Sequence, residues 1–515
     1  MNRDRGSAGT VRVAGSPTAA AAADAAAEAE AMGLVEAARA ATSDVPVIET
    51  GPTGIDAIEP LVLCTQEGTT TFHYTPTADA VTRFVDDVAT GTLPTDEADA
   101  VVDHDPEPDR LPVPESGPLS VGDRLALGPC GWVDPAEPAD HAFLSDAQLE
   151  SVESMGLLGR GRGDAATDAP VFDEWTTARD ADGEPVVVVN ANEADERSRA
   201  ADTLLGGAPY PVLDAAVAVA EFVDASDVIV YCNESAEGLH DRLTRAIDAA
   251  RDEFAVVPQV VAGPDTFTAG EETMALEALE GADRIEARIR PPGPAEHGLY
   301  GRPTVVHTPR TLAQVYRALE APDAVGSAAP FEPADADPGT RLVTVAGDVD
   351  APATVELPTG SSLATVTDAV TGDEFKTAVV GGQFGGFAPD LDVPASAPSL
   401  DSAGLGTNGV VELLGDSRCV VAEVGERSRF ASESNCGRCV PCREGTTQLV
   451  EKLRAVYDGE YDAEGLRELA RVMARSSTCT FGVTAGRPVR TALAAFEPEF
   501  RAHANGRCPS GTCKI

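Results

Sequence analysis

Lysine is nearly absent from this sequence, and acidic residues greatly outnumber basic ones. Only Lys376, Lys452 and Lys514 occur among 515 residues, and 85 acidic against 38 basic residues give a formal net charge of −47 at pH 7. Such a surface argues against nucleic acid or an anionic membrane as a partner, because both carry negative charge. The acidic residues are spread along the whole chain, so a disordered acidic tail does not explain them. They indicate a halophilic protein in a salty cytoplasm, where salt screens the repulsion.

Long apolar runs are also absent. No run of about 18 or more apolar residues occurs, so the sequence encodes no direct membrane span. The alanine-rich stretch at 18–41 contains aspartate and glutamate, which the apolar region of a signal peptide lacks. Hydrophobic residues make up 43% of the chain, and the length predicts about three or four domains. We therefore expect a cytoplasmic protein, with a position at the periphery of a membrane complex as the alternative.

Most of the ten cysteines lie in the last hundred residues, which in a large intracellular chain indicates metal ligation and not structural disulfides. Cys436, Cys439 and Cys442 form a C-x2-C-x2-C run, and Cys479 follows. Each two-residue step lets the backbone curl back, so three thiolates can wrap one corner of a small cluster and a fourth completes a [4Fe–4S] site. The alternatives are a disulfide pair or a zinc site. Zinc sites usually pair C-x2-C with a second C-x2-C or H-x3–5-H, which is absent here.

The cysteine run belongs to a longer motif. Residues 433–446 read Glu-Ser-Asn-Cys-Gly-Arg-Cys-Val-Pro-Cys-Arg-Glu-Gly-Thr. This resembles the E-S-C-G-x-C-x-P-C-R-E-G-T signature of the NADH-binding flavoprotein (51-kDa-type, or F) subunit of respiratory complex I and its diaphorase relatives in NAD-linked hydrogenases and formate dehydrogenases. Asn435 is an extra residue before the first cysteine. The resemblance implies a cluster that takes electrons from a flavin, with NADH and other redox subunits as partners, either a thioredoxin-like [2Fe–2S] protein or dehydrogenase or hydrogenase subunits.

The resemblance, together with alternating strand and helix patterns, predicts an α/β multidomain protein. The expected units are a degenerate thioredoxin-like domain at 1–95, a Rossmann-like flavin/NADH-binding α/β domain at 120–325, a β-grasp (SLBB-like) domain at 338–400, a four-helix bundle with the iron–sulfur cluster at 415–505, and a Cys-containing tail at 506–515. Residues 96–118 and 322–338 are rich in proline, alanine and acidic residues and are expected to be linkers.

The thioredoxin-like domain is expected to lack its cluster. In the related domain a G-C-x-G-x-C segment precedes a Pro-Leu-Val strand, but here Pro52 and Asp56 stand where the thiolates would be. The first ligand pair, expected after Val13, is also missing, and Cys64 alone cannot hold a cluster. The resemblance therefore implies a domain that has kept its fold and lost its metal.

A glycine-rich segment beginning at Gly156 is the first candidate for binding a cofactor. Glycines let a backbone approach a phosphate closely, although such turns are common in other proteins. The segment resembles G-L-R-G-R-G-G-x-G-F-P-T-G-x-K-W of the family, which cradles flavin mononucleotide (FMN). Ala165 and Ala166 replace the Phe-Pro pair, and Pro170 replaces the lysine. The residues that the resemblance assigns to the cofactor are Gly159, Arg160 and Gly161.

The buried strand that begins at Val186 ends in polar residues, at the edge where α/β sheets bind their ligands. Its end resembles C-N-A-D-E-x-E-P-G, which implies contacts to flavin and nicotinamide from Asn190, Asn192, Glu193 and Asp195. Asn192 replaces an aspartate and can still accept a hydrogen bond, but it carries no charge. Asp195 replaces a glutamate near the nicotinamide.

Two further segments resemble the family's pocket. The first segment, residues 263–273, resembles the family's G-A-G-A-Y-I-C-G-E-E-T. The resemblance implies that four of its residues bind NADH and flavin: Phe267, Gly270, Glu271 and Glu272. The alternative is that the two glutamates only form a charged first helical turn, which the helix dipole favours.

The second segment, residues 306–312, resembles the family's V-N-N-V-E-T-L. His307 and Thr308 replace its paired flavin-contacting asparagines. The resemblance assigns these two residues and Thr311 to the cofactor site. His307 either still donates a hydrogen bond to a ligand or is an ordinary surface residue. Gly293 replaces another aromatic residue of the NADH pocket.

The C-terminal tail carries soft metal ligands without another role. It resembles the C-P-A-G-V-C segment of hydrogenase-type relatives. We hypothesise that Cys419, His503, Cys508 and Cys513 bind one zinc ion. The alternative is a set of reduced free thiols.

Two functions are consistent with these motifs. In the first, the protein is an NADH dehydrogenase (diaphorase) subunit that passes hydride from NADH to FMN and single electrons to the [4Fe–4S] cluster; the flavin carries the chemistry, so no catalytic side chain is assigned. In the second, it is an iron–sulfur electron-transfer or scaffold subunit that has lost NADH binding, with or without the loss of flavin binding. Substitutions on the flavin face support the second: Ala165, Pro170, Asn192, Gly293, His307 and Thr308. We favour the first, because a near-isosteric site can still bind.

Overall fold

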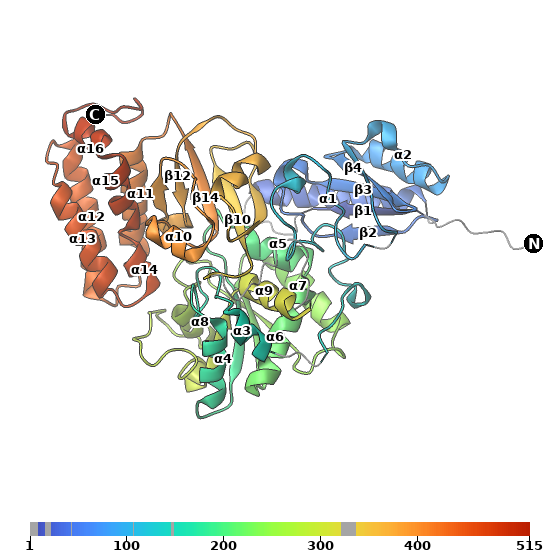
Figure 1. Cartoon of the computed structure of the whole chain (residues 1–515), viewed down its shortest axis with the longest axis horizontal. Coiled ribbons are helices and arrows are strands. Elements are labelled where there is room, and N and C mark those ends of the chain that lie inside the picture. The colour runs from blue at the N-terminus through green and yellow to red at the C-terminus, as the bar shows by residue number, and fades with distance from the viewer. Residues whose placement is uncertain are drawn as a thin grey trace, which may run out of the picture.

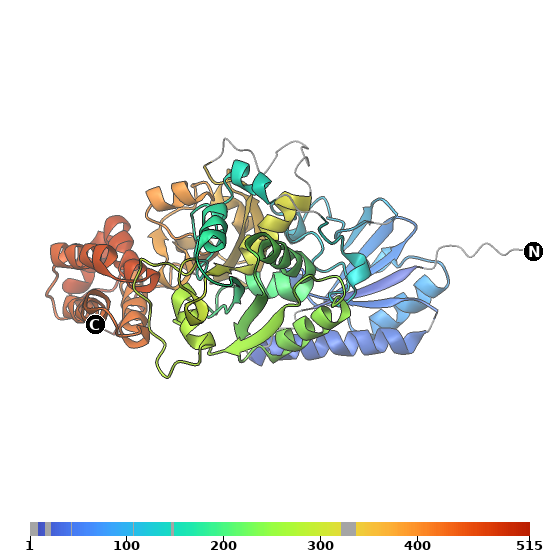
Figure 2. The same cartoon turned by 90° about the horizontal axis from the view of Figure 1, so that it is seen from below.

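In the residues that it describes, the computed structural model is an elongated arrangement of three sheets and one helical bundle. It describes residues 9–15, 22–42, 44–106, 108–145, 149–320 and 336–514. The N-terminal sheet and the C-terminal bundle lie at opposite ends, and the α/β unit and a further sheet lie between them (Figures 1 and 2). The predicted linker at 322–338 falls almost wholly outside the described residues.

The N-terminal unit is a five-stranded sheet in the order β2-β1-β3-β4-β5. β1 and β2 are parallel and the other neighbours antiparallel. Helices α1 and α2 pack on it through a core that includes Leu34, Val81 and Phe84. The elements are β1 (Thr10–Ala14), α1 (Ala22–Ala41), β2 (Val47–Thr50), β3 (Leu61–Gln66), β4 (Thr69–Tyr74), α2 (Ala78–Ala89) and β5 (Ala100–Asp103).

The stretch expected to be a linker after residue 95 contains structure. β5 pairs antiparallel with β4, so the sheet extends to Asp103, and Leu111 is buried farther on. The strand forms at the short apolar pair Val101–Val102. The prediction missed it because acidic residues and prolines dominate the composition of the surrounding segment.

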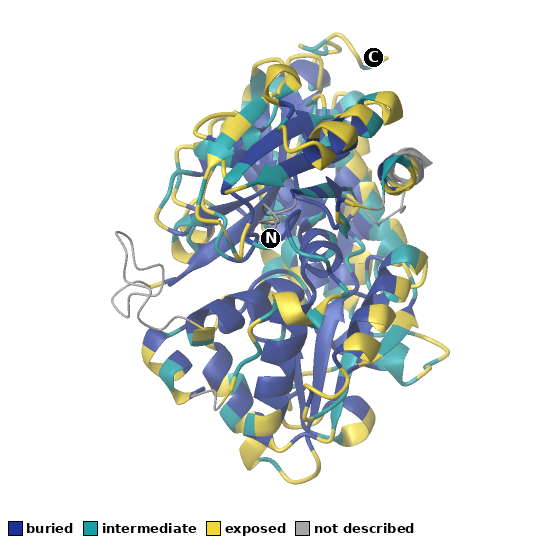
Figure 3. Cartoon of the chain, turned by 90° about the vertical axis from the view of Figure 1, so that its right-hand side faces the viewer, coloured by how far each residue is buried: buried dark blue, intermediate teal, exposed yellow. Residues whose placement is uncertain are grey.

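The α/β unit contains a parallel four-stranded sheet in the order β8-β7-β6-β9. Val186 to Val189 are fully buried, as expected of a parallel strand covered on both faces. In Figure 3 the α/β unit lies in the lower half, and much of its interior has the colour of buried residues. Because the strands are parallel, the polar residues that end β6 and β9 meet at one edge of the sheet. The elements are α3 (Glu150–Met155), α4 (Val171–Asp180), β6 (Val186–Ala191), α5 (Ala200–Gly207), α6 (Tyr210–Val223), β7 (Asp227–Asn233), α7 (Glu237–Ala249), β8 (Gln259–Gly263), α8 (Glu272–Leu279), β9 (Thr304–His307) and α9 (Pro309–Glu320).

The central sheet has the order β11-β10-β14-β12-β13. β14 lies beyond residue 400, where the sequence predicted the end of this unit, yet it is the middle strand and pairs with both β10 and β12. The sequence predicts a helix over 362–371, and the structure has a 3-10 helix over Leu363–Ala369. The other elements are β10 (Thr340–Gly347), β11 (Ala353–Pro358), β12 (Phe375–Val380), β13 (Gly386–Ala388), α10 (Ala397–Ser402) and β14 (Val410–Gly415).

The C-terminal bundle surrounds a core that includes Leu449, Leu453 and Leu466. The spacing of apolar residues predicts a single helix over 488–501. The structure breaks this helix at Phe496, because Pro498 lacks the N–H that a continuous helix needs and instead lies in the first turn of a new one. The helices are α11 (Val420–Ser434), α12 (Val440–Tyr457), α13 (Ala463–Ser476), α14 (Thr480–Thr484), α15 (Arg487–Ala495) and α16 (Glu497–Ala504).

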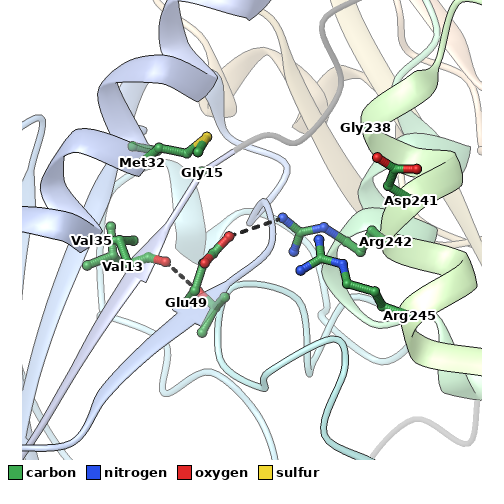
Figure 4. Close-up of a pocket in the computed structure, with 11 residues that line it drawn as sticks. Val13, Gly15, Met32, Val35, Glu49, Gly238, Asp241, Arg242 and Arg245 are labelled. Carbon is green, nitrogen blue, oxygen red and sulfur yellow. Dashed lines mark hydrogen bonds and ion pairs between the residues drawn. The ribbon is translucent and has the colours of Figure 1, made fainter. Parts of the chain in front are cut away.

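A loop of the N-terminal unit, residues 51–59, packs against both neighbouring units. A Cβ at Gly51 would overlap the carbonyl of Gly206 in α5, and the Thr354 N–H donates to the Gly54 carbonyl at 2.6 Å. Glu49, just before the loop, pairs with Arg242 of α7 at 3.7 Å, beside a cavity of about 300 Å³ (Figure 4). This loop, which was expected to lack cluster ligands, is therefore a packing element.

Cys64 is the one cysteine in residues 1–95. It is fully buried in β3, and burial raises the pKa of its thiol to about 12, so it is a neutral core residue. Of the stretch after Val13, where the first ligand pair is missing, residues 16–21 lie outside the described residues. Among the described residues no single helix is long and apolar enough to cross a membrane; α5 and α6 reach those limits only together and are bent by 93° at their junction.

Candidate cofactor and cluster sites

The four cysteines predicted to hold a cluster line one small pocket. Cys436 and Cys439 lie in the loop between α11 and α12, Cys442 lies in the first turn of α12, and Cys479 caps α14. Burial and the three neighbouring thiols raise the pKa of Cys442, as expected of sulfurs that are held close together. The sulfur donors and their convergence from two segments fit a [4Fe–4S] cluster.

The extra residue in the motif, Asn435, ends helix α11. Its side-chain amide donates to the carbonyls of Ala431 and Ser432, each at 2.9 Å, and its Oδ1 accepts from the N–H of Gly437 at 3.0 Å. Gly437 has a φ of +76°, which favours glycine at this sharp turn. The insertion is therefore accommodated as a cap, and the cysteines that follow still converge.

Arg160 of the glycine-rich segment points away from any ligand. Its guanidinium is buried, pairs with Asp337 at 2.7 Å and donates to the carbonyls of Pro338 and Thr340 at 2.7 and 3.2 Å. It therefore ties the glycine-rich segment to β10. Gly159 and Gly161 bring no side chain into the glycine-rich segment. A Cβ at Gly159 would overlap the Ala166 carbonyl, so the two backbone stretches can approach each other only because residue 159 is glycine.

The asparagines at the end of β6 hold neighbouring backbone in place. Asn190 donates to the carbonyls of Gly163 and Gly270, at 2.9 and 3.1 Å, and so joins the glycine-rich segment to the start of α8. Asn192 donates to the Pro264 carbonyl at 3.0 Å, and its Oδ1 is buried without a hydrogen-bond partner. A buried acceptor without a partner is the kind of atom that a ligand can satisfy.

The two acidic residues that follow are engaged in ion pairs. Glu193 pairs with Arg310 and accepts from Ser198 at 2.9 Å. Asp195 pairs with Arg197 at 3.1 Å. Both carboxylates are therefore neutralised by the chain itself.

Glu271 and Glu272 have different surroundings. Glu271 caps α8, accepting from the N–H groups of Thr273 and Met274 at 2.9 and 3.0 Å, which agrees with the helical alternative for this residue. Glu272 pairs with Arg290 and lines a cavity, and burial together with Glu271 raises its pKa to about 8.

His307 is fully buried, so its assignment as an ordinary surface residue is wrong. Its Nε2 accepts from Trp175 Nε1 at 2.7 Å, and its Nδ1 faces Asp164 at 3.2 Å. Asp164 also accepts from the Thr308 N–H at 3.2 Å and from Thr311 Oγ1 at 2.6 Å. The structure thus brings His307, Thr308 and Thr311 together around a carboxylate that sequence reasoning missed. The sequence feature that could have identified Asp164 is the presence of a charged residue within a glycine-rich motif.

A cavity of about 240 Å³ lies between the glycine-rich segment and the bundle. Its walls include the rings of Phe267, Phe384 and Phe481, and Phe481 also lines the cysteine pocket. Phe267 and Glu272 are the predicted side chains that face it. An aromatic-walled cavity with a few polar groups, directly beside the cluster cysteines, fits a planar cofactor such as the isoalloxazine ring of FMN.

The tail residues predicted to bind zinc are brought together. The ligand atoms of Cys419, His503, Cys508 and Cys513 all lie within 4.8 Å of one another. His503 is fully buried, its Nε2 lies 3.2 Å from Cys419 Sγ, and its Nδ1 donates to the Glu499 carbonyl at 2.8 Å. A histidine so oriented presents its Nε2 lone pair to the sulfurs, the usual arrangement of a metal ligand.

Two thiols of this group differ in how readily they ionise: burial and the neighbouring Cys513 and Cys508 raise the pKa of Cys419 to about 12, whereas Cys508 shifts the other way. Burial opposes ionisation of Cys508, but hydrogen bonds from Ser510 and from backbone N–H groups lower its pKa to about 5. The sulfur is therefore a thiolate at neutral pH, which is the form that binds zinc.

Two family models match this chain. The iron–sulfur binding region of NADH-ubiquinone oxidoreductase F matches residues 423–503, and the Nuo51 FMN-binding domain matches residues 152–317. The first contains the four cysteines, and the second contains the glycine-rich segment and His307.

Curated relatives align over most of their length. The F subunit of NADH-quinone oxidoreductase from Streptomyces coelicolor is 30% identical over 404 residues, covering 72% of this chain and 86% of the relative. The HndC subunit of the NADP-reducing hydrogenase from Solidesulfovibrio fructosivorans is 28% identical over 435 residues, covering 76% and 85%.

A solved structure has the same fold. The crystal structure of NAD+-reducing [NiFe]-hydrogenase in the H2-reduced state matches with a TM-score of 0.63 and 24% identity, covering 97% of this chain and 84% of that one. The resemblance predicted from the motifs is confirmed: the chain belongs to the family of NADH-quinone oxidoreductase F subunits, with the family's FMN-binding and iron–sulfur binding regions.

Proposed function

We propose that this protein is the NADH dehydrogenase (diaphorase) subunit of an oxidoreductase complex. The observation that carries the proposal is that the aromatic-walled cavity and the four-cysteine pocket share Phe481. A flavin bound in the cavity would accept hydride from NADH and release electrons singly, which suits a neighbouring iron–sulfur cluster.

The chain's own residues position and enclose this cavity. Asn190 fixes the glycine-rich segment against the start of α8, and Glu271 fixes that helix's first turn. Phe267 makes edge-to-face contacts with Phe384 and with Phe481, the ring that also lines the cysteine pocket. We infer that Asn192, Phe267, Gly270 and Glu272 contact the cofactors, and that Arg160, Asn190, His307 and Thr311 support them.

We further infer the identity of the units. The sheet orders support a thioredoxin-like N-terminal domain without a cluster, a Rossmann-like flavin/NADH domain, a β-grasp (SLBB-like) domain and a helical bundle. The relatives named as quinone oxidoreductase and hydrogenase subunits support other redox subunits as partners. We propose a cytoplasmic location, with a position at the periphery of a membrane complex as the alternative.

Cofactor content tests the proposed function. Protein purified anaerobically in high salt should release about one flavin and about four irons per chain, and its visible absorbance should bleach on addition of NADH. Four irons without flavin would instead establish the alternative, an electron-transfer or scaffold subunit with an empty cavity.

We propose that Cys419, His503, Cys508 and Cys513 hold one structural zinc ion, since four closed ligands are typical of structural sites. Elemental analysis should give about one zinc per chain, and Cys513→Ser should lower it severalfold while leaving iron unchanged. Cys232→Ala, which removes a buried thiol from the α/β core, is the matched control and should keep both metals. Full iron content with no zinc in the unaltered protein would refute the site.

A further inference from the structure

The glycine-rich segment carries two charged side chains, Arg162 and Asp164, where the family motif has glycines. Asp164 is 2% exposed. Its carboxylate accepts from the N–H of Ala166 at 2.8 Å, in addition to the Thr308 N–H and the Thr311 hydroxyl. Converging N–H and hydroxyl donors of this kind bind phosphate in other proteins. Here the chain's own carboxylate already uses them.

Arg162 points to the opposite side, into the cavity. Its guanidinium carbon lies 3.9 Å from the ring centroid of Phe267, and its Nε is buried without a hydrogen-bond partner. Within the described part of the chain no carboxylate pairs with it. The acidic groups nearest to it have other partners: Glu193 pairs with Arg310, Asp195 with Arg197, Glu272 with Arg290, and Glu271 caps α8.

A second guanidinium faces the same cavity from helix α15. Arg487 is half-buried, and its nearest acceptor, the Phe384 carbonyl, is 3.5 Å away. Burial and the neighbouring Arg490 lower the pKa of Arg487, and the charges of Asp401 and Asp168 offset this only in part. The acidic residues on the cavity wall, Asp168 and Glu272, pair with Arg341 and Arg290. The cavity therefore presents two cations and aromatic rings to a ligand.

We propose that Arg162 and Arg487 receive the phosphate of the nucleotide bound in this cavity, in place of the backbone donors that Asp164 occupies. The proposal rests on the proposed function and names the residues by which this cavity recognises its ligand. The group that the two arginines would recognise is a phosphate ester on a planar aromatic compound. FMN provides this group as its phosphate, and NADH provides it as its pyrophosphate.

Binding to the full chain, with its flavin removed and its cluster intact, tests this proposal. FMN and riboflavin share one ring system and differ by the phosphate, so their affinity ratio isolates the phosphate; ADP-ribose reports the pyrophosphate of the dinucleotide. Arg162→Gln and Arg487→Gln should each weaken FMN or ADP-ribose by about tenfold and leave riboflavin within about twofold. Arg162→Lys should restore much of the loss, because the charge is kept. Arg179→Gln is the matched control, since Arg179 also lies over an aromatic ring, Phe222 at 4.6 Å, but outside the cavity.

The outcomes separate this proposal from the proposed function. If the two glutamine variants lose affinity for FMN alone or for ADP-ribose alone, the result supports the proposal and identifies which ligand supplies the phosphate. If Arg162→Gln and Arg487→Gln leave the affinities for FMN and for ADP-ribose unchanged, the proposal is overturned. In that case, bleaching of the visible absorbance by NADH would still support the diaphorase function. An unaltered chain that retains its irons but binds none of the three ligands overturns both.

Discussion

Cys442→Ser should purify with less than about one iron per chain in place of about four. Cys442 is 5% exposed and lies in the first turn of α12, where its sulfur faces the pocket shared with the other three cysteines. A serine oxygen is a poor ligand for an iron–sulfur cluster, and the buried site leaves no space for an external ligand to replace it. The visible absorbance of the cluster should fall in proportion to the iron.

Two further measurements sharpen this prediction. Flavin content should stay near that of the unaltered protein, because Cys442 does not line the cavity between the glycine-rich segment and the bundle. Cys130→Ala, which removes a fully buried thiol far from the bundle, should retain all the iron. A Cys442→Ser protein that keeps four irons would show that another residue is the fourth ligand.

Asp337→Ala should lower the free energy of unfolding of the region around β10 by about 3–5 kcal/mol. Asp337 is fully buried and pairs with both Arg160 and Arg341, at 2.7 and 2.9 Å. Its removal leaves the Arg160 guanidinium buried without a carboxylate, and the cost of that unpaired charge dominates the effect. The loss should persist in high salt, because buried pairs are screened much less than exposed ones.

Urea unfolding followed by tryptophan fluorescence measures this change. The control is Asp348→Ala, which removes the partner of the exposed Arg418 and should cost about 1 kcal/mol or less. The two guanidiniums hold the pKa of Asp337 below its usual range, against the effect of burial. The stabilisation it provides is therefore present at neutral pH and disappears as the pH falls through that lowered pKa. Equal destabilisation by the two substitutions would contradict this account.

The parts of the fold that are set by local patterns were predictable. Val186 to Val189 form a continuous buried strand, and the period of Leu449 and Leu453 marks helix α12. The spacing of Cys436, Cys439 and Cys442 is a local property as well, so their convergence required no knowledge of the tertiary structure. The break before α16 could also have been foreseen, since Pro498 was visible in the sequence.

The parts set by distant partners were not predictable. β14 is a short apolar segment whose role as the middle strand depends on β10, about seventy residues earlier in the chain. The burial of His307 depends on Trp175 and Asp164, which come from other elements. Arg160 fits a phosphate-binding motif by sequence, but its partner Asp337 turns it toward the central sheet. Side-chain direction at this site is decided by contacts that no local motif contains.

The close contact between Gly51 and Gly206 has a consequence for which substitutions this loop can accept. Gly51 cannot acquire a side chain while the Gly206 backbone stays in place, because a Cβ at Gly51 would overlap the Gly206 carbonyl. Any larger residue at position 51 would have to push the loop away from α5. The joint between the N-terminal unit and the α/β unit therefore depends on a missing side chain, and not on any ligand that the loop could hold.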